Sequence, residues 1–351
     1  MDIDWSTLGF HYTETDYIVR ASFHGHWANG ELVGEWSAPY ATRNKMIPVH
    51  AAATGLQYGQ QVFEGLKVFR GVDGKVRVFR WKDNALRMQA SAVGLKMAPV
   101  PVELFEQAMR LVIAKNKRFI PPYETGATLY LRPILFGSMH RIAVGPGHDF
   151  EFVIVASPIG PYYPGKFHCT SFIVNRRVDR SALFGTGAFK AGGNYGSSFR
   201  ATETAHLAGY DCLFLDSKNH RYIDECSAAN FIGIRRILQE NQTDLYEYLT
   251  PRSTAILPSI TNKSLMTLAK EKGIKVTRRK IRLEELADMQ EAAACGTACV
   301  ISPMDKVYDP DHEITYHFGA EPGPILTELY HSLQDIQYGR VKDTHRWCTI
   351  L

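Results

Sequence analysis

The residues with the clearest chemical potential lie between Gly185 and Tyr195, in the segment GTGAFKAGGNY. Its single lysine, Lys190, is surrounded by four glycines. Glycine lets the backbone turn sharply and lets a flat group approach closely. Desolvation lowers the pKa of an ammonium group, and the free amine can attack a carbonyl carbon. The segment therefore predicts a nucleophilic lysine at position 190.

Three other interpretations of this segment have to be weighed. A phosphate-binding P-loop needs its lysine after the last glycine and before a serine or threonine, but Lys190 is followed by Ala191. A dinucleotide-binding turn needs a third glycine in G-x-G-x-x-G, which is missing after Gly187. A solvated loop is the commonest structure of a glycine-rich segment, so the rest of the chain must decide.

Length and composition indicate a two-domain globular protein. The chain has 351 residues, more than one core usually supports, with 45% hydrophobic and 22% charged residues. The net charge of +4 comes without a basic run interleaved with aromatic residues, which argues against nucleic-acid binding. No apolar run reaches the ~20 residues of a membrane span, and the first residues, MDIDW, lack the features of a signal peptide. We therefore expect a cytoplasmic protein without a membrane partner.

The six cysteines are scattered and do not form a disulfide framework. Cys295 and Cys299 are four positions apart without a matching second pair, so we expect no zinc site and no other metal.

The first part of the chain predicts a small N-terminal α/β domain over residues 1–160. Strands are expected over residues 19–36, 66–80, 127–136 and 150–156, with a hairpin turn at Gly71–Gly74. Asp83 is expected to cap one helix, and a second helix is expected over residues 102–118. The proline- and glycine-rich segment around residues 157–165 indicates a boundary, so we take residues 161–170 as an interdomain linker.

Residues 171–351 form the predicted large C-terminal domain. Strands are expected at residues 171–174, 210–215, 221–225 and 228–233, and a polar loop insertion at 236–247. The helix that follows Ile256–Thr261 would present unpaired backbone amides to a phosphate group. A further helix is expected over residues 284–294, ahead of a small-residue turn that starts at Cys295.

Six motifs occur along the chain: YGQQVFEG at 58–65, YLRP at 130–133, GTGAFKAGGNYGSS at 185–198, SAANF at 227–231, ILPSIT at 256–261 and CGTA at 295–298. In these motifs, over residues 21–347, the chain resembles the branched-chain amino acid aminotransferases, enzymes of pyridoxal phosphate fold type IV. The resemblance implies an α/β (α+β) fold of two domains and pyridoxal 5′-phosphate as the cofactor.

The resemblance also assigns roles around the cofactor. Lys190 would be the Schiff-base lysine, Glu225 the carboxylate beside the pyridine nitrogen, and Tyr195 the hydrogen-bond partner of the ring oxygen. Leu257 would pack against the ring. The phosphate would be bound by the residues at four positions: Arg87, Ile260, Thr261 and Thr297.

For the substrate, the resemblance implies a largely apolar pocket that suits the side chains of leucine, isoleucine and valine. Arg132 would contact the second carboxylate of glutamate or 2-oxoglutarate, and the turn at Ala298 and Cys299 would bind the α-carboxylate. The enzyme would transfer the amino group by a ping-pong mechanism and form a homodimer. The expected pocket residues are Phe23, Tyr58, Phe63, Gly65, Tyr130 and Tyr162.

The chain departs from the family's pattern in three places, and three alternative functions stay open. Ala228 replaces a frequent threonine, Ser302 replaces the second cysteine of a C-x-x-C pair, and Arg176 and Arg177 add charge at an unusual position. The alternatives are an aminotransferase for another apolar or unusual L-amino acid, a relative that acts on D-amino acids or as a lyase, and a non-catalytic binding protein.

Overall fold

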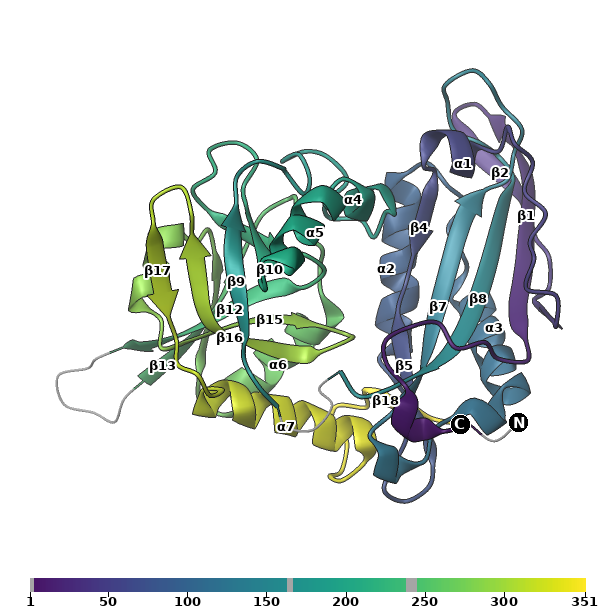
Figure 1. The fold of residues 1–351 in the computed structure, drawn as a ribbon. Coiled ribbons are helices and arrows are strands. Elements are labelled where there is room, and N and C mark those ends of the chain that lie inside the picture. Colours follow the sequence, from purple (N-terminus) through teal and green to yellow (C-terminus); the bar gives the residue numbers. More distant parts are fainter. Residues whose placement is uncertain (1–2, 163–166, 238–244) are drawn as a thin grey trace. The chain divides into compact units, whose positions relative to one another are not determined.

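The structure, a computed structural model, describes residues 3–162, 167–237 and 245–351 (Figure 1). The chain divides into two compact units. The N-unit comprises Met1–Pro164, Phe189–Gly192 and Asp335–Leu351, and the C-unit comprises Gly165–Ala188 and Gly193–Gln334. The domain limits at residues 160 and 171 stay predictions, and residues 163–166 of the predicted linker lie outside the described residues.

One antiparallel sheet forms the centre of the N-unit. Its strands follow the order β18-β6-β5-β7-β8-β1-β2, with β3 paired to β1 and β4 paired to β7. The strands are β1 (Ile18–Ala28), β2 (Glu31–Trp36), β3 (Tyr40–Thr42), β4 (Gln61–Phe63), β5 (Leu66–Arg70), β6 (Val76–Phe79), β7 (Thr128–Gly137), β8 (Phe150–Ile159) and β18 (Cys348–Ile350). The predicted hairpin over residues 66–80 is confirmed by the antiparallel pair β5–β6.

Two helices, α2 (Trp81–Gly94) and α3 (Val102–Lys115), supply apolar side chains to the core of the N-unit, and α1 (Thr54–Tyr58) precedes β4. Asp83 does not cap α2, because the helix begins two residues earlier, after Arg80. The carboxylate of Asp83 instead accepts a hydrogen bond from Arg80 Nε at 2.8 Å. The prediction for α3 extended three residues too far, since a separate 3₁₀ turn occupies Lys117–Phe119.

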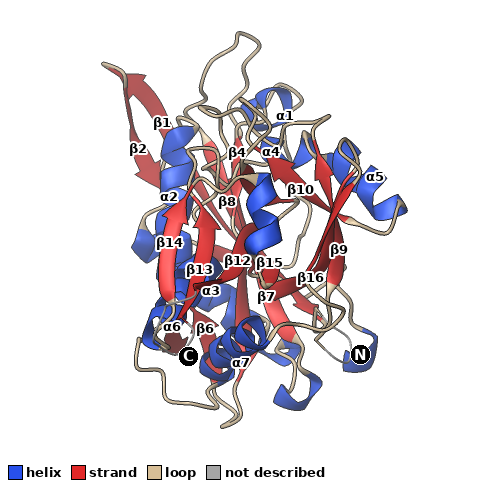
Figure 2. Cartoon of the chain, turned by 90° about the vertical axis from the view of Figure 1, so that its left-hand side faces the viewer, coloured by secondary structure: helices blue, strands red, loops and turns tan. Residues whose placement is uncertain are grey.

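The sheet of the C-unit closes into a ring. Its strands follow the order β11-β10-β9-β16-β15-β12-β13-β14, and an additional pairing of Glu225 with Asn230 joins β11 to β12 (Figure 2). The strands are β9 (Thr170–Asn175), β10 (Asp211–Leu215), β11 (Ile223–Cys226), β12 (Asn230–Ile237), β13 (Leu245–Pro251), β14 (Lys275–Arg279), β15 (Glu291–Gly296), β16 (Val300–Asp309) and β17 (Ile314–His317). The ring therefore closes at Glu225 itself.

The helices of the C-unit are α4 (Gly193–Gly196), α5 (Phe199–Leu207) and α6 (Ile260–Glu271), while α7 (Pro324–Tyr338) carries the chain back to the N-unit. The helix predicted over residues 284–294 is wrong. A 3₁₀ turn at Leu283–Asp288 is followed by β15, which is buried in the middle of the sheet. Of the predicted loop insertion, residues 238–244 lie outside the described residues, while Ile237 ends β12 and Leu245 begins β13.

Among the described residues, no helix combines the length and the apolar character needed to cross a bilayer.

Candidate active site

Lys190 lies in the N-unit, where β4 fixes its backbone. An isolated β-bridge joins Val62 to Ala191, and Phe63 N donates to Lys190 O at 3.0 Å. Lys190 N in turn donates to Ser91 Oγ on α2, also at 3.0 Å. Gly192, two residues on, lies close to the side chain of Gln61, because a Cβ atom on Gly192 would lie 2.4 Å from Gln61 Nε2. Hydrogen bonds on both sides thus hold the half-buried lysine, and its Nζ lies 4.6 Å from the ring centroid of Phe63.

A fully buried carboxylate, Glu64, follows Phe63 in the chain and binds Arg87. Arg87 Nε and Nη2 donate to its two oxygens at 2.7 and 2.8 Å, and Asn84 Nδ2 donates at 2.8 Å. Burial opposes ionisation of Glu64, but the charges of Arg87 and Lys190 and these hydrogen bonds lower its pKa below the ordinary value. Glu64 is thus a buried anion that orients the predicted phosphate-binding arginine. The sequence alone does not reveal this role, although Glu64 stands in the motif at 58–65.

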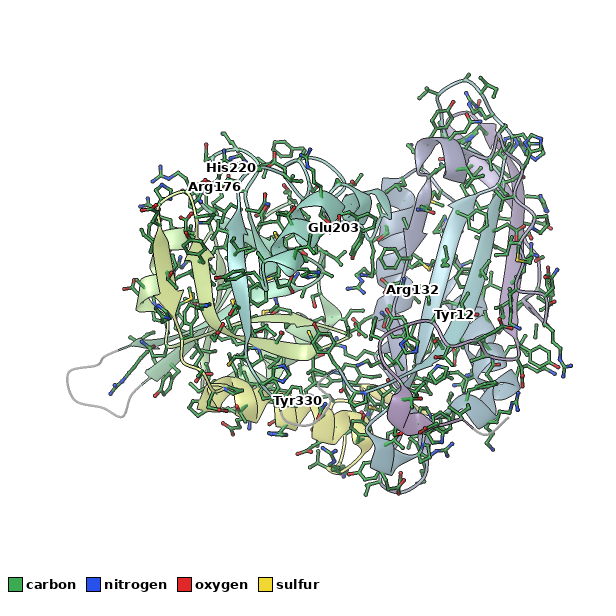
Figure 3. The ribbon with its side chains drawn as sticks, in the orientation of Figure 1. Tyr12, Arg132, Arg176, Glu203, His220 and Tyr330 are labelled. Atoms are coloured by element: carbon green, nitrogen blue, oxygen red, sulfur yellow. The ribbon has the colours of Figure 1, made fainter. Side chains whose placement is uncertain are left out.

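A second group of predicted residues meets around the ring of Phe63. The guanidinium carbon of Arg132, on β7, lies 4.8 Å from this ring centroid and 5.3 Å from that of Tyr130 (Figure 3). Arg132 Nη2 donates to the Tyr130 hydroxyl at 3.2 Å. Gly65 makes room for that hydroxyl, because a Cβ there would lie 1.9 Å from it. The Nζ of Lys190 and the guanidinium of Arg132 therefore both lie against the ring of Phe63.

One atom of Arg132 lacks a partner. Its Nε is buried, and no hydrogen-bond acceptor for it is found in the part of the chain that the structure describes. A buried N–H group without a partner costs free energy, and a ligand oxygen can satisfy it.

The remaining predicted pocket residues of the N-unit have different surroundings. Phe23 is buried in the core, with its ring centroid 5.4 Å from that of Trp36 and 6.1 Å from that of Phe150. The hydroxyl of Tyr58 donates to the carbonyl oxygen of Ile142, and Tyr162 is exposed. Contacts with substrate at these three positions stay predictions.

In the C-unit, Glu225 is buried on β11 and is held by two donors. Its Oε1 accepts a hydrogen bond from Arg180 Nη2 at 2.9 Å and another from the backbone N–H of Leu257. Arg180 is itself buried and also donates to the carbonyl oxygen of Ala255. The functional importance of Arg180 is not evident from the sequence, where it ends a basic segment that looks solvent-facing.

A buried polar network fixes the start of α6. Ser259 caps the helix by accepting from Asn262 N at 3.1 Å, and Asn262 Nδ2 donates to Thr250 Oγ1 at 2.8 Å and to Asn230 Oδ1 at 3.2 Å. Asn230 Nδ2 donates to the carbonyl oxygen of Leu257 at 3.1 Å. The first amides of α6, those of Ile260 and Thr261, have no acceptor within the helix and are available to an anion.

The other predicted positions of the C-unit lie in short turns. Tyr195 belongs to α4, next to Asn194, whose side chain is hydrogen-bonded to Thr186 at 2.6 and 2.8 Å. Thr297, Ala298 and Cys299 form the turn between β15 and β16.

The three sequence departures can also be placed. Arg176 is engaged by Asp309, with Nη2 2.9 Å from Oδ2, and Arg177 is exposed and paired with Asp311 at 2.8 Å (Figure 3). Ser302 is hydrogen-bonded to Thr170 at 3.1 Å, and Ala228 is exposed. All six cysteines are free thiols.

Taken unit by unit, the donors and acceptors are of the kinds that a phosphorylated aromatic aldehyde needs. They include an amine-bearing lysine with a fixed backbone, an arginine oriented by a buried carboxylate, a helix start with available amides, and a buried carboxylate paired with arginine. Among the described residues, no cluster of side chains could hold a metal ion. The segment that carries Lys190 alternates between the units along the chain. Phe189–Gly192 belongs to the N-unit, and the residues before and after it belong to the C-unit.

Together, these features define a transaminase-type enzyme rather than a nucleotide-binding protein. The family model described as amino-transferase class IV matches residues 61–307 of the chain. The protein belongs to the class IV aminotransferase family.

Known proteins similar to the chain carry consistent names. The branched-chain-amino-acid aminotransferase of Haemophilus influenzae is 38% identical over 99% of this chain and 98% of its own length. The enzyme of the same name from Helicobacter pylori is 39% identical over 99% and 97%. The transaminase AMT5 of Alternaria alternata is 35% identical over 98% and 91%.

Solved structures show the same fold. The branched-chain amino acid aminotransferase of Escherichia coli superimposes with a TM-score of 0.73, at 25% identity over 95% of this chain and 99% of that chain. The enzyme of Thermobaculum terrenum, solved in its PLP form, gives a TM-score of 0.73 at 21% identity over 96% and 98%. The predicted fold type IV architecture is confirmed.

Proposed function

We propose that the protein is a branched-chain amino acid aminotransferase that moves the amino group of L-leucine, L-isoleucine or L-valine to 2-oxoglutarate. The observation that carries the proposal is the group of Phe63, Tyr130 and Arg132. It combines an aromatic surface for an apolar side chain with a guanidinium whose buried Nε has no partner among the described residues. One pocket can therefore accept either an apolar side chain or the second carboxylate of glutamate, as the two halves of this reaction require.

The cofactor is pyridoxal 5′-phosphate, which supplies an electron sink for the charge that develops at the substrate Cα. Lys190 anchors it and moves the proton at that carbon, a task worth about 10²–10⁴ in rate. Glu225, kept in place by Arg180 and the amide of Leu257, holds the proton on the ring nitrogen. Tyr195 would donate to the ring oxygen, and Leu257 would pack on the ring.

The phosphate group is held at the start of α6. Within the C-unit, the amides of Ile260 and Thr261 and the hydroxyl of Thr297 would donate to it, and Arg87 of the N-unit is the arginine proposed to contribute positive charge. Arg87 Nε and Nη2 both donate to Glu64, so this edge of the guanidinium is not the one proposed to contact the phosphate.

The remaining proposed roles are contacts with the substrate. Arg132 reads the second carboxylate of the dicarboxylic partner, and the turn at Ala298 and Cys299 binds the α-carboxylate. The apolar side chain contacts the residues proposed as the pocket wall: Phe23, Tyr58, Phe63, Gly65, Tyr130 and Tyr162. The proposal includes a cytoplasmic location and a homodimer.

An amino-donor panel with 2-oxoglutarate, read as glutamate formed, tests the function. We expect kcat/KM for leucine, isoleucine and valine to exceed that for phenylalanine and methionine. The AMT5 relative is named only as a transaminase, which keeps a second candidate, an enzyme for another apolar or unusual L-amino acid. A preference for a donor outside the branched-chain set would favour that candidate, and no glutamate from any donor would overturn both.

A further inference from the structure

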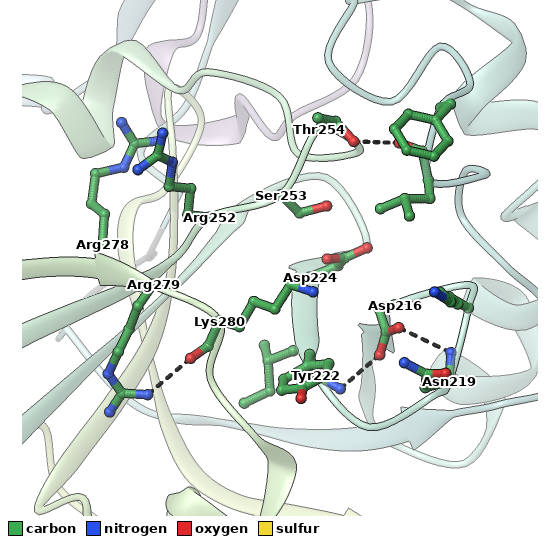
Figure 4. Close-up of a pocket in the computed structure, with 14 residues that line it drawn as sticks. Asp216, Asn219, Tyr222, Asp224, Arg252, Ser253, Thr254, Arg278, Arg279 and Lys280 are labelled. Atoms are coloured by element: carbon green, nitrogen blue, oxygen red, sulfur yellow. Dashed lines mark hydrogen bonds between the residues drawn. The ribbon is translucent and has the colours of Figure 1, made fainter.

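One cavity of the C-unit is lined by charged side chains that have no role in the proposed aminotransferase reaction. It has a volume of about 580 Å³ and lies beside β11, β14 and the segment that follows β13 (Figure 4). Asp224 lines it, and Asp224 is the neighbour of Glu225 on β11. Because consecutive side chains of a strand point to opposite sides, Asp224 and Glu225 point to opposite sides of β11, and Glu225 does not line this cavity.

The lining carries more positive than negative charge. Five cationic side chains line the cavity, Lys218, Arg252, Arg278, Arg279 and Lys280, against the two carboxylates of Asp216 and Asp224. A surplus of like charge in a concave surface attracts small anions.

Two of these charged side chains, Asp216 and Arg279, are already engaged by other groups of the protein. Asp216 is occupied by its own turn, where it accepts the backbone N–H groups of Asn219, Arg221 and Tyr222 at 2.7–3.0 Å. Arg279 is neutralised by Glu285, at 2.6 and 2.9 Å.

Asp224 is the remaining carboxylate. Burial raises its pKa to about 6, while the charges of Arg180 and Lys280 and a hydrogen bond from Ser253 act in the opposite direction. Its charge is therefore partly offset by neighbouring cations when it ionises.

Arg252 and Arg278 differ from Arg279 in that no carboxylate of the described residues is paired with them. Arg252 N donates to Arg279 O at 3.0 Å, so Arg252 and Arg278 stand on adjoining segments. Figure 4 shows both guanidinium groups extending to the same edge of the cavity. Two neighbouring guanidinium groups repel each other, and an anion that accepts from both relieves the repulsion.

We propose that this cavity is an anion site for a small phosphorylated molecule, separate from the cofactor site. Planar guanidinium groups match the oxygens of a phosphate group, which Arg252 and Arg278 would bind together. The wall formed by Leu183, Phe184 and Ile223 would contact the apolar part of the molecule.

Calorimetric titration of the cofactor-loaded protein with inorganic pyrophosphate, in a phosphate-free buffer, tests the site. Saturable binding at one site per chain is expected, weakening as salt is added. The double variant R252A/R278A is expected to weaken it at least about tenfold, because charge-assisted hydrogen bonds are lost. R252K/R278K, which keeps the charge, should weaken it less.

The double variant R110A/K117A is the matched control, since it removes two exposed cations from the N-unit and the same net charge. It should bind pyrophosphate like the unchanged protein. Absence of saturable binding, equal loss in the control, or full binding by a folded R252A/R278A protein would each overturn the proposal. Circular dichroism verifies that every variant is folded.

Discussion

At the scale of single residues, the chemistry depends on Lys190. Replacement by alanine removes the only group proposed both to anchor the cofactor and to move the proton, so turnover should fall by at least about 10³-fold. Borohydride reduction followed by peptide mapping should place the cofactor on Lys190 of the unchanged protein and on no residue of K190A. The exposed Lys82 on α2 is the control, and K82A should keep its activity. Cofactor attached at another lysine would contradict the assignment.

Glu64 should act through Arg87 rather than on the substrate. Breaking a buried ion pair leaves a charge without its partner, so E64Q should lower the free energy of unfolding by about 3 kcal/mol. Because Arg87 is then less well oriented, E64Q should bind pyridoxamine phosphate at least about tenfold more weakly, with a smaller change for pyridoxamine, which lacks the phosphate.

The matched control for E64Q is E106Q, which breaks the exposed pair of Glu106 with Arg110. That change should cost less than about 1 kcal/mol and leave both affinities unaltered. An equal loss for the two ligands in E64Q would assign Glu64 a merely structural role.

Asp224 gives a pH dependence to stability. Its pKa in the folded chain is about 6, above the ordinary 3.8, so its ionisation disfavours the fold. The stabilising contribution of the protonated form is complete below about pH 4 and is lost as the pH rises through 6. D224N should therefore raise the free energy of unfolding at pH 8, by at most about 3 kcal/mol, and this gain should vanish near pH 4. Urea titrations at both pH values measure it, with the exposed Asp288 as D288N for comparison; a gain that is independent of pH would contradict the argument.

At the scale of elements, the sequence predicted the β5–β6 hairpin and central strands such as β7, β8 and β10, but it predicted a helix where β15 lies. The β5–β6 hairpin has a glycine turn between alternating residues, and both signals are local. β15 contains three consecutive alanines that favour a helix by propensity, yet they are buried between β12 and β16. Burial in a sheet outweighs the helical preference of alanine, and only the tertiary structure reveals it.

The candidate site, too, could be predicted from the sequence only in part. Motif positions such as Lys190, Arg87 and Arg132 could be named from the sequence, whereas their partners could not. Arg180 is 45 residues from Glu225, and no spacing rule links them. Glu64 and Arg87 are 23 residues apart on different elements. Such pairs depend on how the chain folds back, so sequence patterns do not reveal them.

The approach of the β4–β5 connection to β7 gives a prediction at this scale. A methyl group on Gly65 would lie 1.9 Å from the Tyr130 hydroxyl and 2.8 Å from Tyr130 Cζ, so the ring must move and Arg132 loses a partner. G65A should lower kcat/KM for leucine and glutamate by roughly 10²-fold, as displacements near 1 Å do, while cofactor affinity stays unchanged. G196A adds its methyl group to open space and should retain stability. Unaltered kinetics in G65A would remove Tyr130 and Arg132 from the pocket.

At the scale of the whole molecule, the C-unit exposes apolar side chains that a solitary chain would leave in water. Phe199 and Leu207, at the two ends of α5, are 66% and 86% exposed. A dimer interface has to bury apolar side chains, and α5 offers two at its ends.

Sedimentation velocity tests the homodimer. The unchanged protein should sediment as a dimer at micromolar concentration, and F199E/L207E should shift it towards the monomer, because two buried charges would have no partners in the interface. Met46 of the N-unit, 77% exposed, provides the control, and M46E should stay dimeric. A monomeric unchanged protein would refute the homodimer, whereas a dimeric F199E/L207E protein would move the interface away from α5. The two results are distinguishable because the first concerns the association itself and the second only the surface that makes it.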